Sequence, residues 1–195
     1  DEAVRRRYVP AGARYVLTVG QSVGYKNHAG AVRAFVRAFA DDPSVHLVLL
    51  QRLGRTADAL VRIARERGAG ERVHVLPALP LEDLVALYRG ALCLLHPSFV
   101  EGWGMPVSEA LAAGCPVVTS DRSSMPEVTG DAGLLVDPES ERSIADALAR
   151  LAGDAALASD LRARGLRRAA ELSWDAHARA TARVYEDVLR GVSPR

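Results

Sequence analysis

Short apolar segments alternate with helical segments along most of this chain. Six segments have the pattern of buried strands, at residues 15–19, 45–50, 73–76, 91–95, 116–118 and 134–136. Helical periodicity occupies residues 29–39, 56–67, 82–88 and 106–113, and from Ser140 onward only helical pattern remains. This alternation is typical of βαβ units. It predicts an α/β fold, a Rossmann-like parallel sheet of six strands with helices on both faces and extra helices at the carboxyl end.

Composition is that of a soluble globular protein. The 195 residues are 49% hydrophobic and 25% charged, with a net charge of +1, so we expect one domain, 1–195, and no nucleic-acid partner. Cys93 and Cys115 lack metal-ligand spacing and indicate buried thiols in a reducing compartment. No apolar stretch is long enough to span a bilayer and no signal peptide is visible, which favours a cytoplasmic location. Because the chain opens on Asp1 rather than Met, we expect a fragment of a longer protein.

The segment from Glu101 to Glu109 contains two carboxylates eight positions apart, with two glycines and a proline between them. A predicted strand precedes it, and a predicted helix begins near Pro106. Ligands bind at this position in open parallel sheets, and the start of a helix favours an anion. The pattern therefore predicts a site where two carboxylates bind hydroxyl groups on either side of a phosphate.

The loop after the first strand contains Lys26, which is the only lysine in the chain. A compact ammonium beside glycines suits a phosphate, although a solvated surface lysine is the alternative. Neither a dinucleotide fingerprint nor a Walker loop follows this strand. The loop therefore argues against a nicotinamide dehydrogenase and against an ATPase.

Several motifs together resemble glycosyltransferase family 4. They are Val19-Gly20 with Lys26-Asn27, the run from His96 to Pro106 leading into Glu109-Ala110, the run 113–118, Pro126-Glu127-Val128, 130–133 with Asp137-Pro138, and Ser173-Trp174. The resemblance covers essentially the whole chain. It implies the carboxyl-terminal, donor-binding half of a GT-B glycosyltransferase. The amino-terminal, acceptor-binding half is then expected to lie outside this sequence.

The resemblance implies a role for each matching residue. Glu101 would bind hydroxyls of the donor sugar, and Lys26 would neutralise the diphosphate leaving group, so these two are the catalytic candidates. Glu109 would accept hydrogen bonds from the ribose. The full set of implied donor-binding residues is Gly20, Gln21, Lys26, Pro77, Leu79, Glu101, Gly102, Trp103, Gly104, Met105 and Glu109.

The family further implies a retaining transferase, with a GDP- or UDP-linked sugar as donor and with no metal or separate cofactor. Hexosyl or mannosyl transfer in bacterial polysaccharide or glycolipid synthesis is expected. The glycan or lipid-linked acceptor would bind through the missing half, and only the full-length protein would associate peripherally with a membrane. The last helices, about 154–190, are expected to pack toward that half, so the fragment alone should be inactive.

Two residues depart from the family pattern. Tyr25 and Gln21 stand where relatives commonly carry arginine. Fewer cationic side chains are therefore expected to contact the phosphates. A non-catalytic nucleotide-sugar-binding module and a nucleotide-sugar epimerase of the same fold therefore remain as alternatives.

Two further residues are expected to be structural. His96 ends the fourth strand and is expected to be packed or on the rim rather than chemically active. Trp174 follows a predicted helix N-cap, Ser173, and is expected to anchor the last helix in the core.

Overall fold

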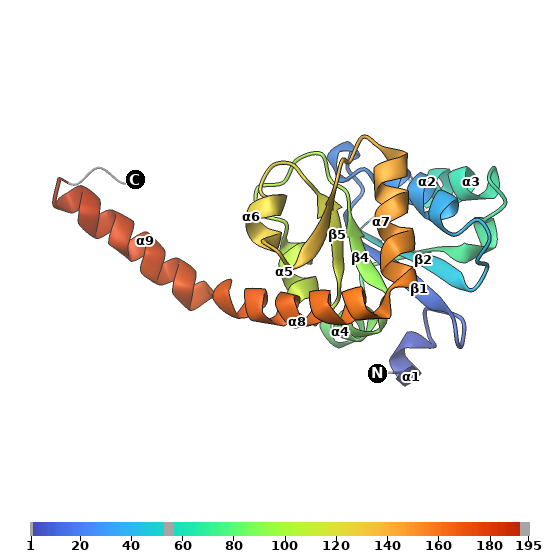
Figure 1. Ribbon diagram of the computed structural model, residues 1–195, viewed down its shortest axis with the longest axis horizontal. Coiled ribbons are helices and arrows are strands. Elements are labelled where there is room, and N and C mark those ends of the chain that lie inside the picture. The colour runs from blue at the N-terminus through green and yellow to red at the C-terminus, as the bar shows by residue number, and fades with distance from the viewer. Residues whose placement is uncertain (1, 53–56, 192–195) are drawn as a thin grey trace.

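A six-stranded parallel sheet forms the centre of the computed structural model, which describes residues 2–52 and 57–191 (Figure 1). The spatial order of the strands is β3-β2-β1-β4-β5-β6, and every neighbouring pair is parallel. Their bounds are β1 Arg14–Gln21, β2 Val45–Arg52, β3 Val73–Leu76, β4 Cys93–His96, β5 Val117–Ser120 and β6 Gly133–Val136.

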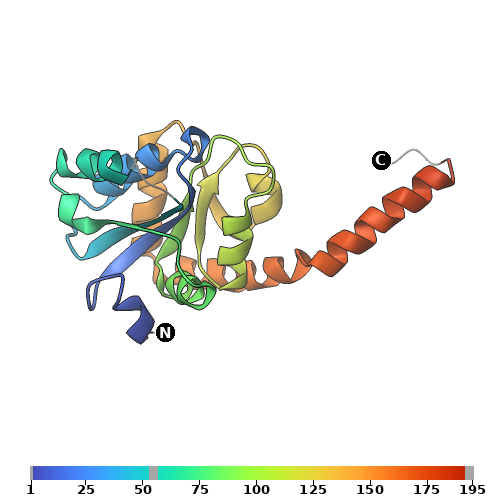
Figure 2. The ribbon, with the colours of Figure 1, turned by 180° about the vertical axis from the view of Figure 1, so that it is seen from behind.

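Helices cover both faces of this sheet (Figures 1 and 2). α2, α3 and α7 pack on one face, and α4, α5 and α6 pack on the other. The central strands are buried from both sides, which is why they read as continuous apolar runs. The helices are α1 Glu2–Arg5, η1 Gly24–Lys26, α2 His28–Ala38, α3 Ala57–Arg65, η2 Gly70–Arg72, α4 Leu81–Gly90, α5 Met105–Ala112, α6 Met125–Thr129, α7 Glu141–Gly153, α8 Ala155–Glu171 and α9 Trp174–Leu189.

The predicted fold class is confirmed, and all six predicted strands are present. The predicted helix 56–67 appears as α3, although its first residue lies outside the described residues. The helical pattern after Ser140 resolves into three helices, α7 to α9. The sequence did not predict α1 or α6. These helices have 4 and 5 residues, which is too short for apolar periodicity to show.

The strand order reverses direction between β1 and β4. Chain crossovers run outward from β1 toward β3 and from β4 toward β6, so the two connecting loops diverge at this point. In open parallel sheets the usual ligand site is the crevice at the carboxyl ends of the strands at this point. The loop after β1 and the loop after β4 are the two that border it. These are the loops in which the sequence places Lys26 and Glu101.

The side chain of Asn27 holds the surrounding loops together. Its Oδ1 accepts from the backbone N–H of Gly30 at 3.2 Å and caps α2. Its amide group donates to the backbone oxygens of Pro97, at 3.2 Å, and Pro138, at 2.7 Å. Asn27 has a left-handed backbone with φ of 53°, a conformation that Asn tolerates better than most residues. One buried amide therefore joins the segments after β1, β4 and β6.

The two last helices differ in their packing. α8 lies against α5, where Leu161 and Gly165 are buried, and Arg168 donates to the backbone oxygen of Val128 at 3.1 Å. α9 extends away from the rest of the domain in both views and buries none of its residues (Figures 1 and 2). Trp174 is 78% exposed, so the prediction that it anchors the core is wrong. Ser173 does cap α9, accepting from the N–H of Ala176 at 3.1 Å.

In the portion of the chain that the structure describes, no helix has both the length and the apolar character that crossing a bilayer requires.

We predict that Asn27→Ala lowers the free energy of unfolding by about 3 kcal/mol, because it removes an N-cap and leaves two buried carbonyl groups without their donor. Ser140 offers a matched control, since its side chain caps α7 and, within residues 2–52 and 57–191, accepts only from the N–H of Ser143. Ser140→Ala should cost about 1 kcal/mol. Urea unfolding of both variants measures the difference. Equal losses would show that the amide does not stabilise the joined loops.

Candidate functional site

Lys26 lies at the mouth of the crevice because of the local backbone. The chain leaves β1 and forms the short helix η1, which ends at Lys26 and returns the side chain toward the strand. A methyl group placed on Gly20 would lie 3.5 Å from Cδ of Lys26, so the lysine stem passes close to the glycine backbone. The side chain of Lys26 is only 11% exposed. Its ammonium lies 5.4 Å from the ring centroid of Tyr25, the residue found where arginine was expected.

Glu101 lies opposite Lys26, and the two side chains form an ion pair. Nζ of Lys26 donates to Oε1 of Glu101 at 2.6 Å. Nε2 of His96 contacts the same oxygen at 2.8 Å, and Oγ of Ser98 lies 3.2 Å from that nitrogen. The side chains of Glu101 and His96 are 8% and 2% exposed. The two catalytic candidates therefore meet, and a buried histidine joins them.

The surroundings of Glu101 keep it ionised. Burial alone would raise the pKa of this carboxyl group, but hydrogen bonds from His96, Lys26 and Ser98 outweigh it and lower the pKa to about 2. The backbone is fixed as well. Oγ of Ser123, in the loop after β5, accepts from the N–H of Glu101 at 3.1 Å and donates to its carbonyl oxygen at 2.6 Å. Glu101 is therefore a charged group with a defined position.

The turn after Glu101 depends on Gly104. Its φ is +91°, and a methyl group there would lie 2.3 Å from Cε of Met125, so only glycine fits. Gly104 precedes α5, which starts at Met105 and has a proline in its first turn. Gly102 is exposed, and Trp103 is 39% exposed while its Nε1–H donates to Oγ of Ser108 at 3.0 Å. That hydrogen bond fixes the turn against the first turns of the helix.

Glu109 lies on α5 and contacts a different helix. The hydroxyl of Tyr88, in α4, donates to Oε2 of Glu109 at 2.9 Å. Burial, and then the charge of Glu109, raise the pKa of Tyr88, so the phenol stays a hydrogen-bond donor. A cavity of about 300 Å³ lies beside this pair between α4 and α5. The hydrogen bonds of Glu109 within the described residues do not link it to the Lys26–Glu101 pair.

The remaining predicted residues lie around the same edge of the sheet. Gly20 and Gln21 end β1, and the backbone oxygen of Gln21 lies 2.9 Å from Nε2 of His28. Pro77 and Leu79 are in the loop between β3 and α4, where Pro77 is exposed and Leu79 packs partly against the core. These four residues lie at or just beyond the carboxyl ends of β1 and β3, but among the described residues no side-chain hydrogen bond or ion pair joins them to Glu101.

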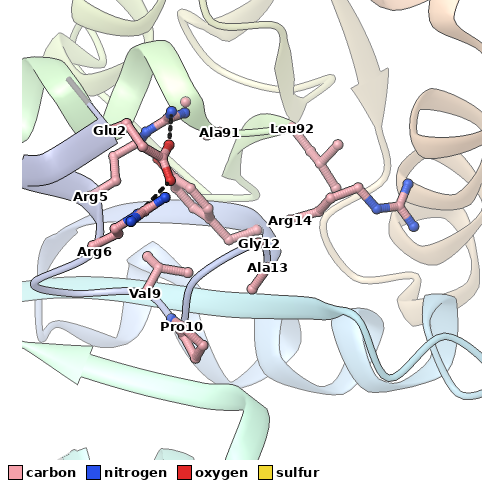
Figure 3. A pocket seen from close by; sticks show the side chains of 12 residues that line it. Glu2, Arg5, Arg6, Val9, Pro10, Gly12, Ala13, Arg14, Ala91 and Leu92 are labelled. Carbon is pink, nitrogen blue, oxygen red and sulfur yellow. Dashed lines mark hydrogen bonds and ion pairs between the residues drawn. The ribbon is translucent and has the colours of Figure 1, made fainter.

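The cavity in Figure 3, of about 310 Å³, lies at the opposite end of the strands. Its lining includes Arg14, the first residue of β1, and Leu92, just before β4. Inside it, Glu2 pairs with Arg5 and Arg6. None of the predicted site residues lines it, and it is at the end of the sheet away from the crevice.

Sequence reasoning missed four side chains of the site. His96 was expected to be packed or on the rim, and it is buried, but it also contacts Glu101. Ser98, Ser123 and Tyr88 were not singled out, although each contacts the site. For three of them the available signal was position relative to the predicted strands, since His96 ends β4, Ser98 follows β4 and Ser123 follows β5. Side chains just beyond adjacent parallel strands lie at the same edge of the sheet.

The arrangement suits an anion flanked by hydroxyl groups. It supplies one ammonium, one carboxylate and the N-terminus of α5 at the carboxyl edge of the sheet, and a second carboxylate, Glu109, farther along α5. Within the described residues no group of three or more His, Cys, Asp or Glu side chains is placed to hold a metal ion.

The chain matches known proteins along most of its length. Residues 2–168 match the family described as "Glycosyl transferases group 1". The chain is 34% identical over 185 residues to O-antigen chain mannosyltransferase B of Escherichia coli, covering 94% of this chain and 48% of that protein. The chain thus spans about half the length of the first curated relatives that it matches.

Solved structures share the fold. A glycosyltransferase from Rickettsia africae ESF-5 superposes with a TM-score of 0.84 at 15% identity, covering 96% of this chain and 51% of that one. The C-terminal domain of a glycosyl transferase group 1 family protein from Francisella tularensis gives 0.75 at 20% identity, covering 88% of this chain and 91% of that one.

The low pKa of Glu101 predicts a pH-dependent contribution to stability. Because the folded-state pKa is lowered, the contribution is complete above the unfolded value near 4.5 and is lost as the pH falls toward about 2. Between about pH 6 and about pH 3 the loss should be about 2 kcal/mol. Urea unfolding across this range should show the loss in the wild type and not in Glu101→Gln. Lys26→Met should reduce it. The same slope in all three proteins would contradict the assignment.

Proposed function

The chain belongs to the family of group 1 glycosyl transferases, and on that premise we propose that it is the half of such an enzyme that binds the nucleotide-sugar donor. The observation that carries the proposal is the meeting of Lys26 with Glu101 at the switch point of the sheet, at 2.6 Å. The two residues come from the two loops that border the crevice. A phosphate-binding cation and a hydroxyl-binding carboxylate thus occupy the place where a nucleotide sugar presents both groups.

Lys26 and the start of α5 receive the diphosphate in this proposal. The ammonium supplies a point charge, and the backbone N–H groups at Gly104 and Met105 supply the positive end of the helix. Once in contact with the diphosphate, both can stabilise the charge that grows on this leaving group as the glycosidic bond breaks.

The carboxylates of Glu101 and Glu109 accept hydrogen bonds from hydroxyl groups on either side of the diphosphate. Glu101, held ionised beside His96, accepts hydrogen bonds from the donor sugar. Glu109, oriented by the hydroxyl of Tyr88, accepts from the ribose. The base lies along the Pro77–Leu79 loop, where backbone groups make most contacts.

The donor is a GDP- or UDP-linked hexose, and we favour a GDP-linked mannose because a 34% identical relative is named as an O-antigen mannosyltransferase. Transfer proceeds with retention of the anomeric configuration, to a glycan or lipid-linked acceptor, in bacterial polysaccharide or glycolipid synthesis. The site uses no metal and no separate cofactor in this proposal, and the enzyme works in the cytoplasm.

The acceptor half of the enzyme packs on α9 in this proposal. Five large apolar side chains of α9 are 45% to 87% exposed: Trp174, Val184, Tyr185, Val188 and Leu189. A cavity of about 540 Å³ lies between this helix and the start of α5, lined by Trp103, Met105, Leu172 and Trp174 among others. Apolar surface of this extent on one helix indicates a protein partner. The other half of a chain twice this length is the partner that the relatives' lengths support.

A non-catalytic nucleotide-sugar-binding module is the second candidate. It is favoured by Tyr25 and Gln21, which replace the arginines expected beside the diphosphate. Sugar transfer by a full-length parent enzyme separates the two candidates, since both predict donor binding by the present chain.

We predict that the chain binds nucleoside diphosphates through Lys26. Calorimetry with GDP, UDP and the corresponding nucleosides is the measurement. Lys26→Met should weaken diphosphate binding by about tenfold, because a charge-assisted hydrogen bond is lost, and should leave nucleoside binding nearly unchanged. Arg37→Met, in the last turn of α2, is a control that removes one positive charge elsewhere. Equal weakening of nucleoside and diphosphate would show that Lys26 does not meet the phosphates.

The two glutamates should differ in which ligands they affect. Glu109→Gln should weaken GDP and GDP-mannose, or UDP and UDP-glucose, by the same factor of about tenfold, because the ribose is common to both ligands. Glu101→Gln should reduce the preference for the nucleotide sugar over the nucleoside diphosphate. The opposite pattern would exchange the two assignments. No change in either variant would refute the two-carboxylate site.

A further inference from the structure

One oxygen of Glu101 is shared by two donors. Oε1 lies 2.6 Å from Nζ of Lys26 and 2.8 Å from Nε2 of His96. A carboxylate only accepts hydrogen bonds, so Nε2 of His96 carries the proton in this contact. All three side chains are at most 11% exposed. The ammonium of Lys26 and the imidazole of His96 therefore both contact Oε1 of Glu101.

The pairing cancels the charge that the proposed ligand needs. With Glu101 at 2.6 Å, Lys26 and Glu101 together present no net charge to an arriving diphosphate. At such separations the interaction between unit charges is far stronger in a partly buried site than in water. A diphosphate gains the full attraction of the ammonium only when Lys26 moves off Oε1. Lys26 has four rotatable methylene groups, so it can move while the backbone stays in place.

We infer that Lys26 exchanges Glu101 for the diphosphate when the donor binds, and that His96 is the positioning residue that keeps Glu101 in place for the sugar. The inference rests on the proposed function and goes beyond it, because it assigns a role to His96 and a partner change to Lys26.

His96 is well held for this role. Its side chain is 2% exposed, and its backbone oxygen accepts from Oγ1 of Thr119, on β5, at 2.8 Å. Ser98 contacts the imidazole, and Ser123 holds the backbone of Glu101 from another loop. These contacts do not involve Lys26. Glu101 therefore retains a donor and a fixed backbone after the ammonium has left.

Lys26 is the only lysine in the chain, which makes the first test specific. Lysine labelled with ¹⁵N at Nζ gives one side-chain ammonium signal. In the ligand-free protein this signal should move when Glu101 is replaced by Gln, because the ion pair is lost. In the wild type it should move again when inorganic diphosphate or GDP is added. A signal that Glu101→Gln leaves unchanged would overturn the pairing whether or not any donor binds.

The second test measures the competition. Glu101→Gln should tighten binding of inorganic diphosphate and GDP by about tenfold, the size expected for one competing charge-assisted hydrogen bond. In a Lys26→Met background the same change should have little effect, because Glu101 acts on the diphosphate through the lysine. An equal gain in both backgrounds would indicate plain charge repulsion and would overturn the exchange.

The third test concerns His96. His96→Leu should lower the preference for GDP-mannose over GDP by about tenfold, while the affinity for GDP itself stays within about twofold. His96→Gln should restore most of the preference, since its amide can donate to Oε1. His74→Leu is the matched control: His74 lies on β3, which β2 separates from β1, and its Nε2 is 2.8 Å from Nδ1 of His46. The preference should be unchanged in the control.

The outcomes separate the two proposals. A wild-type chain that binds neither diphosphates nor nucleotide sugars refutes the proposed function and the exchange together. A chain that binds the donor normally, with an affinity for diphosphate that Glu101→Gln does not change, refutes only the exchange. If His96→Leu unfolds, which thermal melting would reveal, Ser98→Ala tests the same support. A folded Ser98→Ala with an unchanged preference for GDP-mannose over GDP would then overturn the role of His96.

Discussion

The site depends on the buried amide of Asn27. This side chain caps α2 and donates to backbone oxygens after β4 and β6, so it fixes three loops relative to one another. Lys26 is the residue immediately before it, and the N–H of Phe99 donates to the oxygen of Tyr25 at 2.8 Å in the same region. The ammonium and Glu101 can therefore meet although 75 residues separate them in sequence. Because these loops are held rigidly, the flexible side chain of Lys26 can make a defined contact with Oε1 of Glu101.

The Lys26–Glu101 pair is better explained by ligand binding than by stability. Burying an ion pair costs desolvation energy that the attraction between the charges roughly repays, so such pairs add little net stability. Here the carboxylate also has His96, whose contact does not need the lysine. Functional sites commonly retain groups that do not optimise stability. The ammonium of Lys26, held beside Glu101 at a place that suits a phosphate, is an example of a group that does not optimise stability.

The sequence predicted the fold better than the site. Apolar runs located all six strands, because strands buried on both faces are continuous in sequence. It also selected Lys26 and Glu101, through a single lysine and a glycine-flanked glutamate. It did not predict that they pair, that His96 shares the oxygen, or that Ser123 fixes the backbone, since those contacts join loops from three strands. The error at Trp174 has a similar cause. A tryptophan after an N-cap is typical of a core anchor, but whether a helix lies on the core depends on the path of the chain after α8.

The exposed helix α9 and the turn that follows Glu101 line the same cavity. Trp103 and Met105 line the apolar cavity together with Trp174, and they directly follow the turn that begins at Glu101. The indole N–H of Trp103 is bonded to Ser108, on the helix that also carries Glu109. An isolated helix of 16 residues is only marginally stable in water, so α9 gains order from whatever covers its apolar side chains. A partner domain that covers α9, as proposed, would contact Trp103 and Met105, which lie in the same turn as Glu101, the carboxylate proposed to bind the sugar. Domain packing and donor binding would then act on the same few residues, and no long pathway is needed to couple them.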